Sequence, residues 1–202
     1  DTFFFNNGSS LAGTIDGGAG LDTVDFSASS ASYNVELTAL SAIDGFSGTI
    51  TGMVPGGFSN IDRLTATTAA TYDQIYGLDS ASQWDINGSN TTYTNAAHTL
   101  VLQNFDRLQG GDFEDTFILH GAEKGLLFGN AGDDVFYMMN GATLDGIIKG
   151  GGGVNLLDYS AYTTSVSVDL ALGLATGITS VDSIQNVYGG SANDVLLGNN
   201  GE

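Results

Sequence analysis

The chain has no cysteine and a single proline, Pro55, in 202 residues. Without disulfide bonds, a domain of this size can rely on an apolar core or on a bound metal. The scarcity of proline excludes a proline-rich linker, and the irregular glycine spacing excludes collagen. No run of 18 apolar residues occurs, so the sequence predicts no transmembrane helix and no membrane insertion.

Basic residues are nearly as scarce, with four Lys and Arg against 23 Asp and Glu and a net charge of −19. Nucleic acids and anionic membranes both require basic patches on their partners, so this charge balance excludes both classes. A chain with this charge repels itself unless something neutralises it, and a divalent cation would do so. The alternative is that the acidity only keeps a secreted protein soluble.

Glycine, in contrast, is abundant, at 30 residues. Glycine-led loops recur at spacings that fit turns of about twenty residues, and they begin at residues 110, 129, 150, 189 and 198. Short runs rich in strand-forming residues follow four of these loops, over 115–119, 134–138, 155–159 and 194–198. No segment shows a sustained 3.6-residue apolar period, so we expect almost no helix.

The sequence repeats itself over a longer distance. Residues 1–28 align without gaps on residues 134–161 at a constant offset of 133, with 13 identities in 28 positions. We therefore interpret residues 1–133 as one copy and residues 134–202 as part of a second copy, in a fragment of a repetitive protein.

Later matches between the two copies need a different offset. Residues 60–64 resemble residues 183–187, and residues 72–77 resemble residues 193–198, after a shift of about ten to twelve residues. We expect the first copy to carry an insertion within residues 38–57.

Turns this short cannot bury their apolar face alone, whereas stacked turns form a continuous core with parallel strands about 4.8 Å apart. We therefore expect an all-β fold, a parallel β-solenoid with about twenty residues per turn, that runs through residues 1–202 as one continuous domain. A β-sandwich, which also uses short strands and glycine turns, is the alternative. A sandwich would not require matched loops at equal spacing.

The glycine loops resemble the RTX, or hemolysin-type, calcium-binding nonapeptide G-G-x-G-x-D-x-U-x, in which U is a large apolar residue. Residues 17–25, GGAGLDTVD, fit every position. Residues 198–202 begin a further copy in tandem with the one before. Four other copies each depart at one position: Phe113 in 110–118, Asn130 in 129–137, Asn155 in 150–158 and Ala192 in 189–197.

The nonapeptide suits calcium for a chemical reason. Ca²⁺ takes six to eight hard oxygen ligands at about 2.3–2.6 Å. Glycines allow positive φ angles that turn successive carbonyl oxygens inward, and the Asp adds a carboxylate. Because one loop supplies too few oxygens, a loop one turn away must supply the rest. The resemblance therefore implies Ca²⁺ ions in a row between turns.

We expect the best calcium sites between loops 110–115 and 129–134, and between loops 129–134 and 150–155. The side-chain ligands are expected from Asp115, Asp134 and Asn155. The carbonyl ligands are expected from Gly110, Asp112, Gly129, Ala131, Gly150 and Gly152. The outer loops are expected to add Gly17, Ala19, Asp22, Gly189 and Asp194. The alternative is that all of these loops are metal-free turns.

Residues 166–177 and 181–198 resemble spacer sequence between RTX copies in large bacterial adhesins. This resemblance implies a right-handed solenoid that serves as a calcium-stabilised structural or adhesive repeat module. The parent would be a secreted or cell-surface bacterial protein exported by type I secretion. Its partners would be calcium ions, surface polysaccharide and neighbouring solenoid segments.

We expect no enzymatic activity, because the four basic residues stand in no motif with His or Tyr at matched positions. Two alternatives remain. One is an accessory or catalytic β-helix of a polysaccharide-active enzyme. The other is a carbohydrate- or ice-binding face, for which the Thr-rich run 65–71 is the relevant segment.

Overall fold

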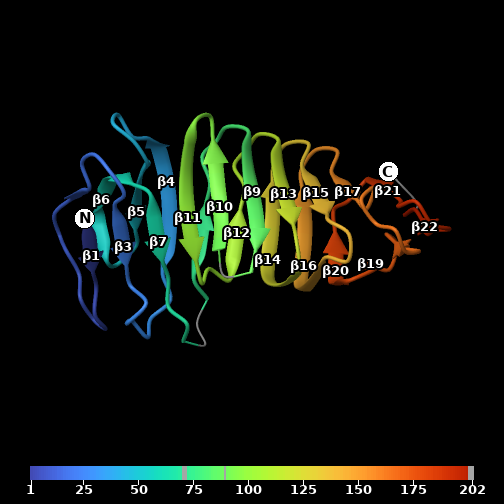
Figure 1. Cartoon of the computed structure of the whole chain (residues 1–202), viewed down its shortest axis with the longest axis horizontal. Coiled ribbons are helices and arrows are strands. Elements are labelled where there is room, and N and C mark those ends of the chain that lie inside the picture. Colours follow the sequence, from blue (N-terminus) through green and yellow to red (C-terminus); the bar gives the residue numbers. More distant parts are fainter. Residues whose placement is uncertain (70–71, 89, 200–202) are drawn as a thin grey trace. The chain divides into compact units, whose positions relative to one another are not determined.

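The computed structural model describes residues 1–69, 72–88 and 90–199, and within these ranges it contains strands and no helix (Figure 1). The strands belong to two large, mostly parallel sheets, so the prediction of an all-β fold is confirmed. In the described ranges, no helix is long and apolar enough to cross a membrane. Residues 70–71 of the Thr-rich run and 200–202 of the last glycine loop lie outside the described residues.

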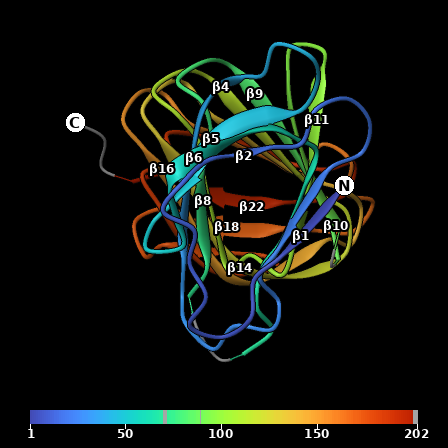
Figure 2. The same cartoon turned by 90° about the vertical axis from the view of Figure 1, so that its left-hand side faces the viewer.

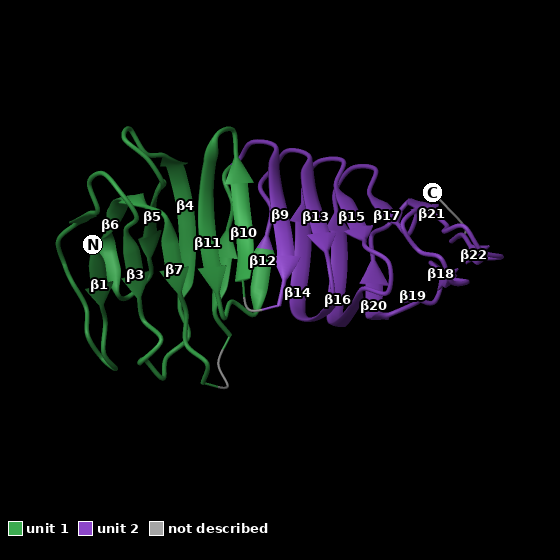
Figure 3. Cartoon of the chain, viewed as in Figure 1, with its two compact units in different colours: residues 1–78, 89–108 green, residues 79–88, 109–202 purple. Residues whose placement is uncertain are grey.

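The chain divides into two compact units, which are coloured separately in Figure 3. Unit 1 is formed by residues 1–78 and 89–108, and unit 2 by residues 79–88 and 109–202. Each unit contains strands of both sheets. Strand β12 (Arg107–Gln109) begins in unit 1 and ends in unit 2.

In unit 1, parallel pairing dominates the first sheet. The second sheet has both kinds of pair, because β5 pairs antiparallel with β4 and β6 and lies between them (Figure 2), whereas β2–β6 and β4–β8 are parallel. The first sheet has the order β1 (Thr2–Phe4), β3 (Thr23–Asp25), β7 (Arg63–Thr65), β11 (His98–Gln103) and β10 (Asn90–Asn95). The second has the order β2 (Ile15–Asp16), β6 (Val54–Ile61), β5 (Phe46–Ile50), β4 (Asn34–Leu40) and β8 (Gln74–Tyr76).

In unit 2, the chain passes back and forth between the two sheets, and all the described pairs of the first sheet are parallel. The first sheet has the order β9 (Ser82–Asn87), β13 (Asp115–Leu119), β15 (Val135–Met138), β17 (Leu156–Asp158) and β21 (Asn186–Tyr188). The second has the order β14 (Ala122–Asn130), β16 (Thr143–Gly151), β20 (Ile178–Asp182), β19 (Leu174–Ala175), β18 (Ser167–Asp169) and β22 (Val195–Leu197).

The four runs that the sequence indicates as strands each contain one: β13, β15, β17 and β22. The side chains of β13 and β15 alternate between the interior and the surface, as the pleat of a strand requires. Residues at matching positions of neighbouring parallel strands therefore stack in columns.

One such column forms the core of unit 2. Trp84, Phe117 and Phe136 pair in register on β9, β13 and β15, and all three are fully buried. Their ring centroids lie 5.7 and 5.0 Å apart with nearly parallel planes. Each buried aromatic side chain removes about 150–250 Å² from water, at about 25 cal/mol per Å². This column therefore stabilises the stacking of successive strands by several kcal/mol.

Antiparallel hairpins interrupt the parallel pattern, and the sequence did not predict them. In unit 1, β5 pairs with both β4 and β6, and it lies within the expected insertion at 38–57. In unit 2, the shorter β19 lies between β18 and β20 in the same way. Because a hairpin returns to the same sheet, extra residues here lengthen the loop without changing which strands pair across turns.

The pairing of unit 1 recurs in unit 2 with the offset found in the sequence. Ile15 of β2 pairs with Phe58 of β6, and Ile148 of β16 pairs with Val181 of β20. The first members of these pairs are 133 residues apart and the second members 123, because the β4–β5–β6 hairpin is the longer one. The pairs β1–β3, β3–β7 and β4–β8 recur in the same register as β15–β17, β17–β21 and β18–β22.

Candidate functional site

A ladder of polar side chains runs along the starts of the parallel strands of unit 2. Its members are Ser82, Asp115, Asp134, Asn155 and Gln185. The main-chain N–H of each of the first four members donates to a side-chain oxygen of the next. The N···O distances are 3.0 Å from Ser82 to Asp115, 2.9 Å from Asp115 to Asp134, 2.9 Å from Asp134 to Asn155 and 2.7 Å from Asn155 to Gln185.

The three central members of the ladder are almost completely buried. Asp115 is 1% exposed, and Asp134 and Asn155 are 0% exposed. A buried polar group is costly unless it is hydrogen-bonded, so each bond of the ladder holds two neighbouring turns in one register. The predicted side-chain ligands therefore already act as structural links between turns.

The glycine loops that precede these side chains adopt the backbone that the nonapeptide pattern requires. Positive φ angles occur at the second and fourth positions of three loops, at Gly18 and Gly20, Asn130 and Gly132, and Gly151 and Gly153. Loops 110–115 and 189–194 carry Phe113 and Ala192 at the fourth position, and their described residues show no positive φ. Side chains disfavour this backbone region, so loss of the glycine at the fourth position accompanies a different loop geometry, whereas Asn130 at the second position keeps a positive φ.

The first glycine of a loop leaves room for the carboxylate that ends the loop. A Cβ atom on Gly129 would lie 2.0 Å from Asp134 Oδ2 and 2.5 Å from the carbonyl oxygen of Gly150. A Cβ atom on Gly110 would lie 2.2 Å from Asp115 Oδ2 and 2.5 Å from the carbonyl oxygen of Gly129. Each loop therefore folds around its own carboxylate and beside a carbonyl oxygen of the next loop.

Loops 110–115, 129–134 and 150–155 contact one another in this order. The N–H of Ala131 donates to the carbonyl oxygen of Gly111 at 3.4 Å, and the N–H of Gly152 donates to that of Asn130 at 2.7 Å. The structure thus brings together the three loops in which the main calcium sites are expected.

The residues expected to supply carbonyl ligands differ in their surroundings. The carbonyl oxygens of Gly129 and Gly150 lie beside carboxylates, as described above. The carbonyl oxygen of Gly110 accepts a hydrogen bond from Asn130 Nδ2 at 2.6 Å, and that of Gly152 accepts one from Asn155 Nδ2 at 3.4 Å. Asp112 is exposed and Ala131 is partly exposed.

One carboxylate oxygen of Asp134 is unsatisfied. Its Oδ2 is buried and has no hydrogen-bond partner among the described residues. Burial, followed by the neighbouring carboxylates of Asp115, Asp133 and Glu114, raises the pKa of Asp134 to about 7. The N–H of Asp115, which donates to Oδ1, opposes this shift only in part. This oxygen therefore needs a proton or a cation near neutral pH.

Asp115 differs from Asp134 although it occupies the same position in its loop. Its Oδ1 accepts bonds from the N–H and the hydroxyl of Ser82, and its Oδ2 accepts one from the N–H of Gly111 at 2.8 Å. Burial raises the pKa of Asp115 to about 6, against the effect of these bonds. Both oxygens have partners within the protein, so this carboxylate is satisfied without a metal.

Both side-chain polar atoms of Asn155 have hydrogen-bond partners. Its Oδ1 accepts the N–H of Asp134, and its Nδ2 donates to the carbonyl oxygen of Ser183 at 3.0 Å. An amide thus fits between a donor and an acceptor where a carboxylate would face an acceptor. Of the three central ladder members, Asp134 is the one that fits a hard cation.

No family model and no curated protein matches this chain. The chemistry of the loops themselves is therefore the basis for assigning a function. No three His, Cys, Asp or Glu side chains gather to hold a metal ion in the described part of the chain. Any cation bound here would need main-chain carbonyl oxygens beside a carboxylate, and these are hard ligands of the kind that Ca²⁺ prefers.

The outer loops repeat this arrangement at both ends of the chain. Asp22 is 1% exposed, and its Oδ2 is buried without a hydrogen-bond partner among the described residues. Gly17 lies beside Asp22, as Gly129 lies beside Asp134, while Ala19 is exposed.

The loop of Asp194 is less enclosed. Its Oδ1 accepts the N–H of Val166 at 2.9 Å, and its Oδ2 lies 2.3 Å from where a Cβ of Gly189 would be. Asp194 is partly exposed, in contrast to Asp22 and Asp134.

Several ladder-type residues lie outside the nonapeptides, and the motif search could not find them. Asp62 accepts the N–H of Asp22 at 2.9 Å, and Asp73 accepts the N–H of Tyr33 at 2.7 Å. Asp106 in turn accepts the N–H of Asp73 at 2.9 Å. The repeat alignment contained the signal for Asp62, which matches Gln185 of the ladder, and for Asp73, which matches Asp194.

Proposed function

We propose that this chain is a calcium-stabilised parallel β-solenoid, a structural or adhesive repeat module of a secreted or cell-surface bacterial protein. The unsatisfied, buried Oδ2 of Asp134, beside the carbonyl oxygen of Gly150, is the observation that carries the proposal. Asp134 has a neutral counterpart in Asn155 and a fully hydrogen-bonded one in Asp115. The carboxylate at 134 therefore has a function that the fold alone does not require.

Asp134 Oδ2 and the carbonyl oxygen of Gly150 would hold the ion in this module. Bound calcium supplies positive charge that neutralises a buried carboxylate. The chain's own residues position the ligands, because the ladder fixes the spacing of the loops and Gly129 leaves room for the carboxylate of Asp134.

Calcium would act on the folding equilibrium rather than on a reaction. An ion that binds the folded state alone stabilises it by mass action, so its binding energy adds to the free energy of unfolding. With a net charge of −19, the chain repels itself when calcium is low. A low-calcium cytoplasm would then favour the unfolded, exportable chain, and calcium outside the cell would favour the folded module.

The described fold also supports a structural role. Parallel strands in matching register form columns of stacked side chains, such as Trp84, Phe117 and Phe136, along unit 2. In a stack of this kind each turn contacts only its neighbours, so its stability is a sum over repeated interfaces along its length. Surface polysaccharide and neighbouring solenoid segments remain the proposed partners of such a module.

Circular dichroism of the full chain during a calcium titration, with EGTA and magnesium as references, tests this function. We expect calcium to restore β signal that is lost in EGTA and to raise the midpoint of thermal unfolding, whereas equal magnesium should have little effect. Identical spectra and melting curves in calcium and EGTA would refute the calcium-dependent module.

A further inference from the structure

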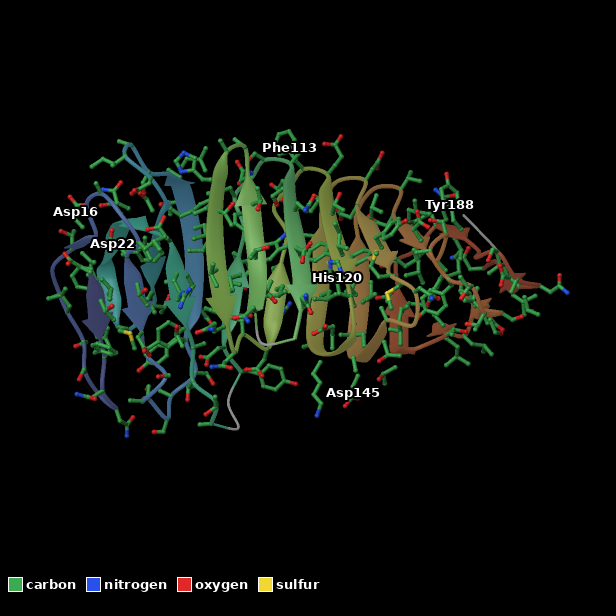
Figure 4. The ribbon with its side chains drawn as sticks, in the orientation of Figure 1. Asp16, Asp22, Phe113, His120, Asp145 and Tyr188 are labelled. Atoms are coloured by element: carbon green, nitrogen blue, oxygen red, sulfur yellow. The ribbon has the colours of Figure 1, made fainter. Side chains whose placement is uncertain are left out.

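The two copies of the repeat carry different charges at equivalent positions around one glycine loop. In the first copy, loop 17–22 is surrounded by acidic side chains, of which Asp16 and Asp22 are labelled in Figure 4. In the second copy, neutral or basic side chains stand at the matching positions. The pairs are Asp16 and Lys149, Asp22 and Asn155, and Asp62 and Gln185.

The backbone around these side chains is the same in both copies. The N–H of Asp22 donates to Asp62 Oδ2 at 2.9 Å, as the N–H of Asn155 donates to Gln185 Oε1 at 2.7 Å. Asn60 has a φ of 55° and its counterpart Ser183 one of 56°. The two copies therefore place different functional groups, amides in the second and carboxylates in the first, on the same main-chain hydrogen-bond pattern.

In the second copy, the amide of Asn155 satisfies this geometry. Its Oδ1 accepts a main-chain N–H, and its Nδ2 donates to the carbonyl oxygens of Ser183, at 3.0 Å, and Gly152, at 3.4 Å. A Cβ on Gly150 would lie 2.1 Å from the carbonyl oxygen of Ser183.

In the first copy, a carboxylate oxygen takes the place of that donor. Asp22 Oδ1 accepts a bond from the N-terminal ammonium of Asp1, as Asn155 Oδ1 accepts the N–H of Asp134, so Oδ2 is the counterpart of the Asn155 Nδ2. A Cβ on Gly17 would lie 2.1 Å from the carbonyl oxygen of Asn60, the counterpart of Ser183. An acceptor thus replaces a donor at this loop, and Asp22 Oδ2 is buried without a hydrogen-bond partner among the described residues.

A second unsatisfied oxygen comes from the β4–β5–β6 hairpin, which is longer than its counterpart in the second copy. Asp44 lies between β4 and β5, and its Oδ2 accepts the N–H of Gly20, in loop 17–22, at 3.0 Å. Its Oδ1 is buried and, among the described residues, has no hydrogen-bond partner. Burial, followed by the carboxylates of Asp44 and Asp22, raises the pKa of Asp62. Three carboxylates therefore act on one another at this loop.

We propose that loop 17–22 and the β4–β5 hairpin together bind one Ca²⁺ ion, through Asp22 Oδ2, Asp44 Oδ1 and the carbonyl oxygen of Asn60. Asp62 adds negative charge beside them. Asp44 lies outside every nonapeptide, so the ion would clamp the inserted hairpin to the loop. This site is separate from the one at Asp134 and can fail or succeed independently of it.

Calcium binding to the full chain and to single variants, measured by isothermal titration calorimetry, tests this site. We expect Asp44→Asn and Asp22→Asn each to bind one Ca²⁺ ion fewer than the unmodified chain, and Asp134→Asn to lose a different ion. A double variant, Asp44→Asn with Asp134→Asn, should lose both. Glu36→Gln, on the exposed face of β4, removes the same charge nearby and should lose none.

Thermal unfolding in EGTA provides a second readout that simple damage to the fold cannot imitate. Because an amide at position 22 would reproduce the contacts of Asn155, Asp22→Asn should raise the unfolding midpoint of the apo chain by about 4 °C. If Asp22→Asn and Asp44→Asn both bound as many Ca²⁺ ions as the unmodified chain, the proposal would be overturned. Loss of an ion in Asp134→Asn alone would leave the proposed function standing without this second site.

Discussion

Replacing Asp134 by Asn should stabilise the chain without calcium and remove most of the effect of calcium at this site. In the apo fold, the pKa of Asp134 is raised from 3.8 to about 7, so its ionised form is disfavoured by about 4 kcal/mol at pH 8. An amide would keep the bond from the N–H of Asp115 and could donate to the carbonyl oxygen of Gly150, as Asn155 donates to that of Ser183. We expect a gain of about 1 to 3 kcal/mol in EGTA, because local relaxation offsets part of the penalty.

Urea unfolding at pH 8, with EGTA and then with calcium, measures both halves of this expectation. Asp115→Asn is the matched control, because both oxygens of Asp115 already accept hydrogen bonds from N–H or O–H groups. An amide at 115 would place a donor against a donor in either orientation. This control should therefore lose about 1 to 3 kcal/mol in EGTA.

A change in the free energy of unfolding in the same direction for both variants in EGTA would show that the carboxylates of Asp115 and Asp134 do not differ in this way. If Asp134→Asn kept the full stabilisation by calcium, the carboxylate would have no part in holding an ion at this loop.

Three further predictions follow from other features. Gly129→Ala should lower the free energy of unfolding by about 3 kcal/mol, because a Cβ at this position would lie 2.0 Å from Asp134 Oδ2. Gly13→Ala is the control in the same urea assay, because the nearest atom to its Cβ would be Leu11 Cδ1, at 3.9 Å. Asp73→Asn should cost about 1 to 3 kcal/mol in that assay, because both of its oxygens accept main-chain N–H groups, of Tyr33 and Thr67. In EGTA, the midpoint of thermal unfolding should fall as pH rises from 5 to 8. The raised pKa values of about 6 for Asp115 and about 7 for Asp134 mean that the folded chain holds protons that the unfolded chain releases. Calcium should raise the midpoint most at pH 8, and a midpoint that rises with pH in EGTA would contradict this prediction.

Local features of the fold were predictable from the sequence. Strand-forming runs after glycine loops gave the positions of β13, β15, β17 and β22, because short strands and tight turns are specified within a few residues. The offset of 133 between the copies anticipated that the pairing of β1 with β3 recurs between β15 and β17. Departures from the nonapeptide at Phe113 and Ala192 also coincide with the loops that lack positive φ angles.

Features that depend on contacts between distant segments were not predictable. The motif assigned the same chemistry to Asp115 and Asp134, yet Ser82 satisfies the first carboxylate and no described residue satisfies Oδ2 of the second. Asp44 stands in an insertion with no repeat to mark it. Its place beside loop 17–22 follows only from the antiparallel hairpin, which the parallel pattern of the sequence does not indicate.

The bonds of the ladder all point one way along the chain, since an earlier residue always donates its N–H and a later side chain always receives it. Each turn of the ladder therefore depends on the following turn to satisfy its buried main-chain donor. Losing one acceptor would leave the donor of the preceding turn unpaired in the interior, at a cost of about 1 to 3 kcal/mol.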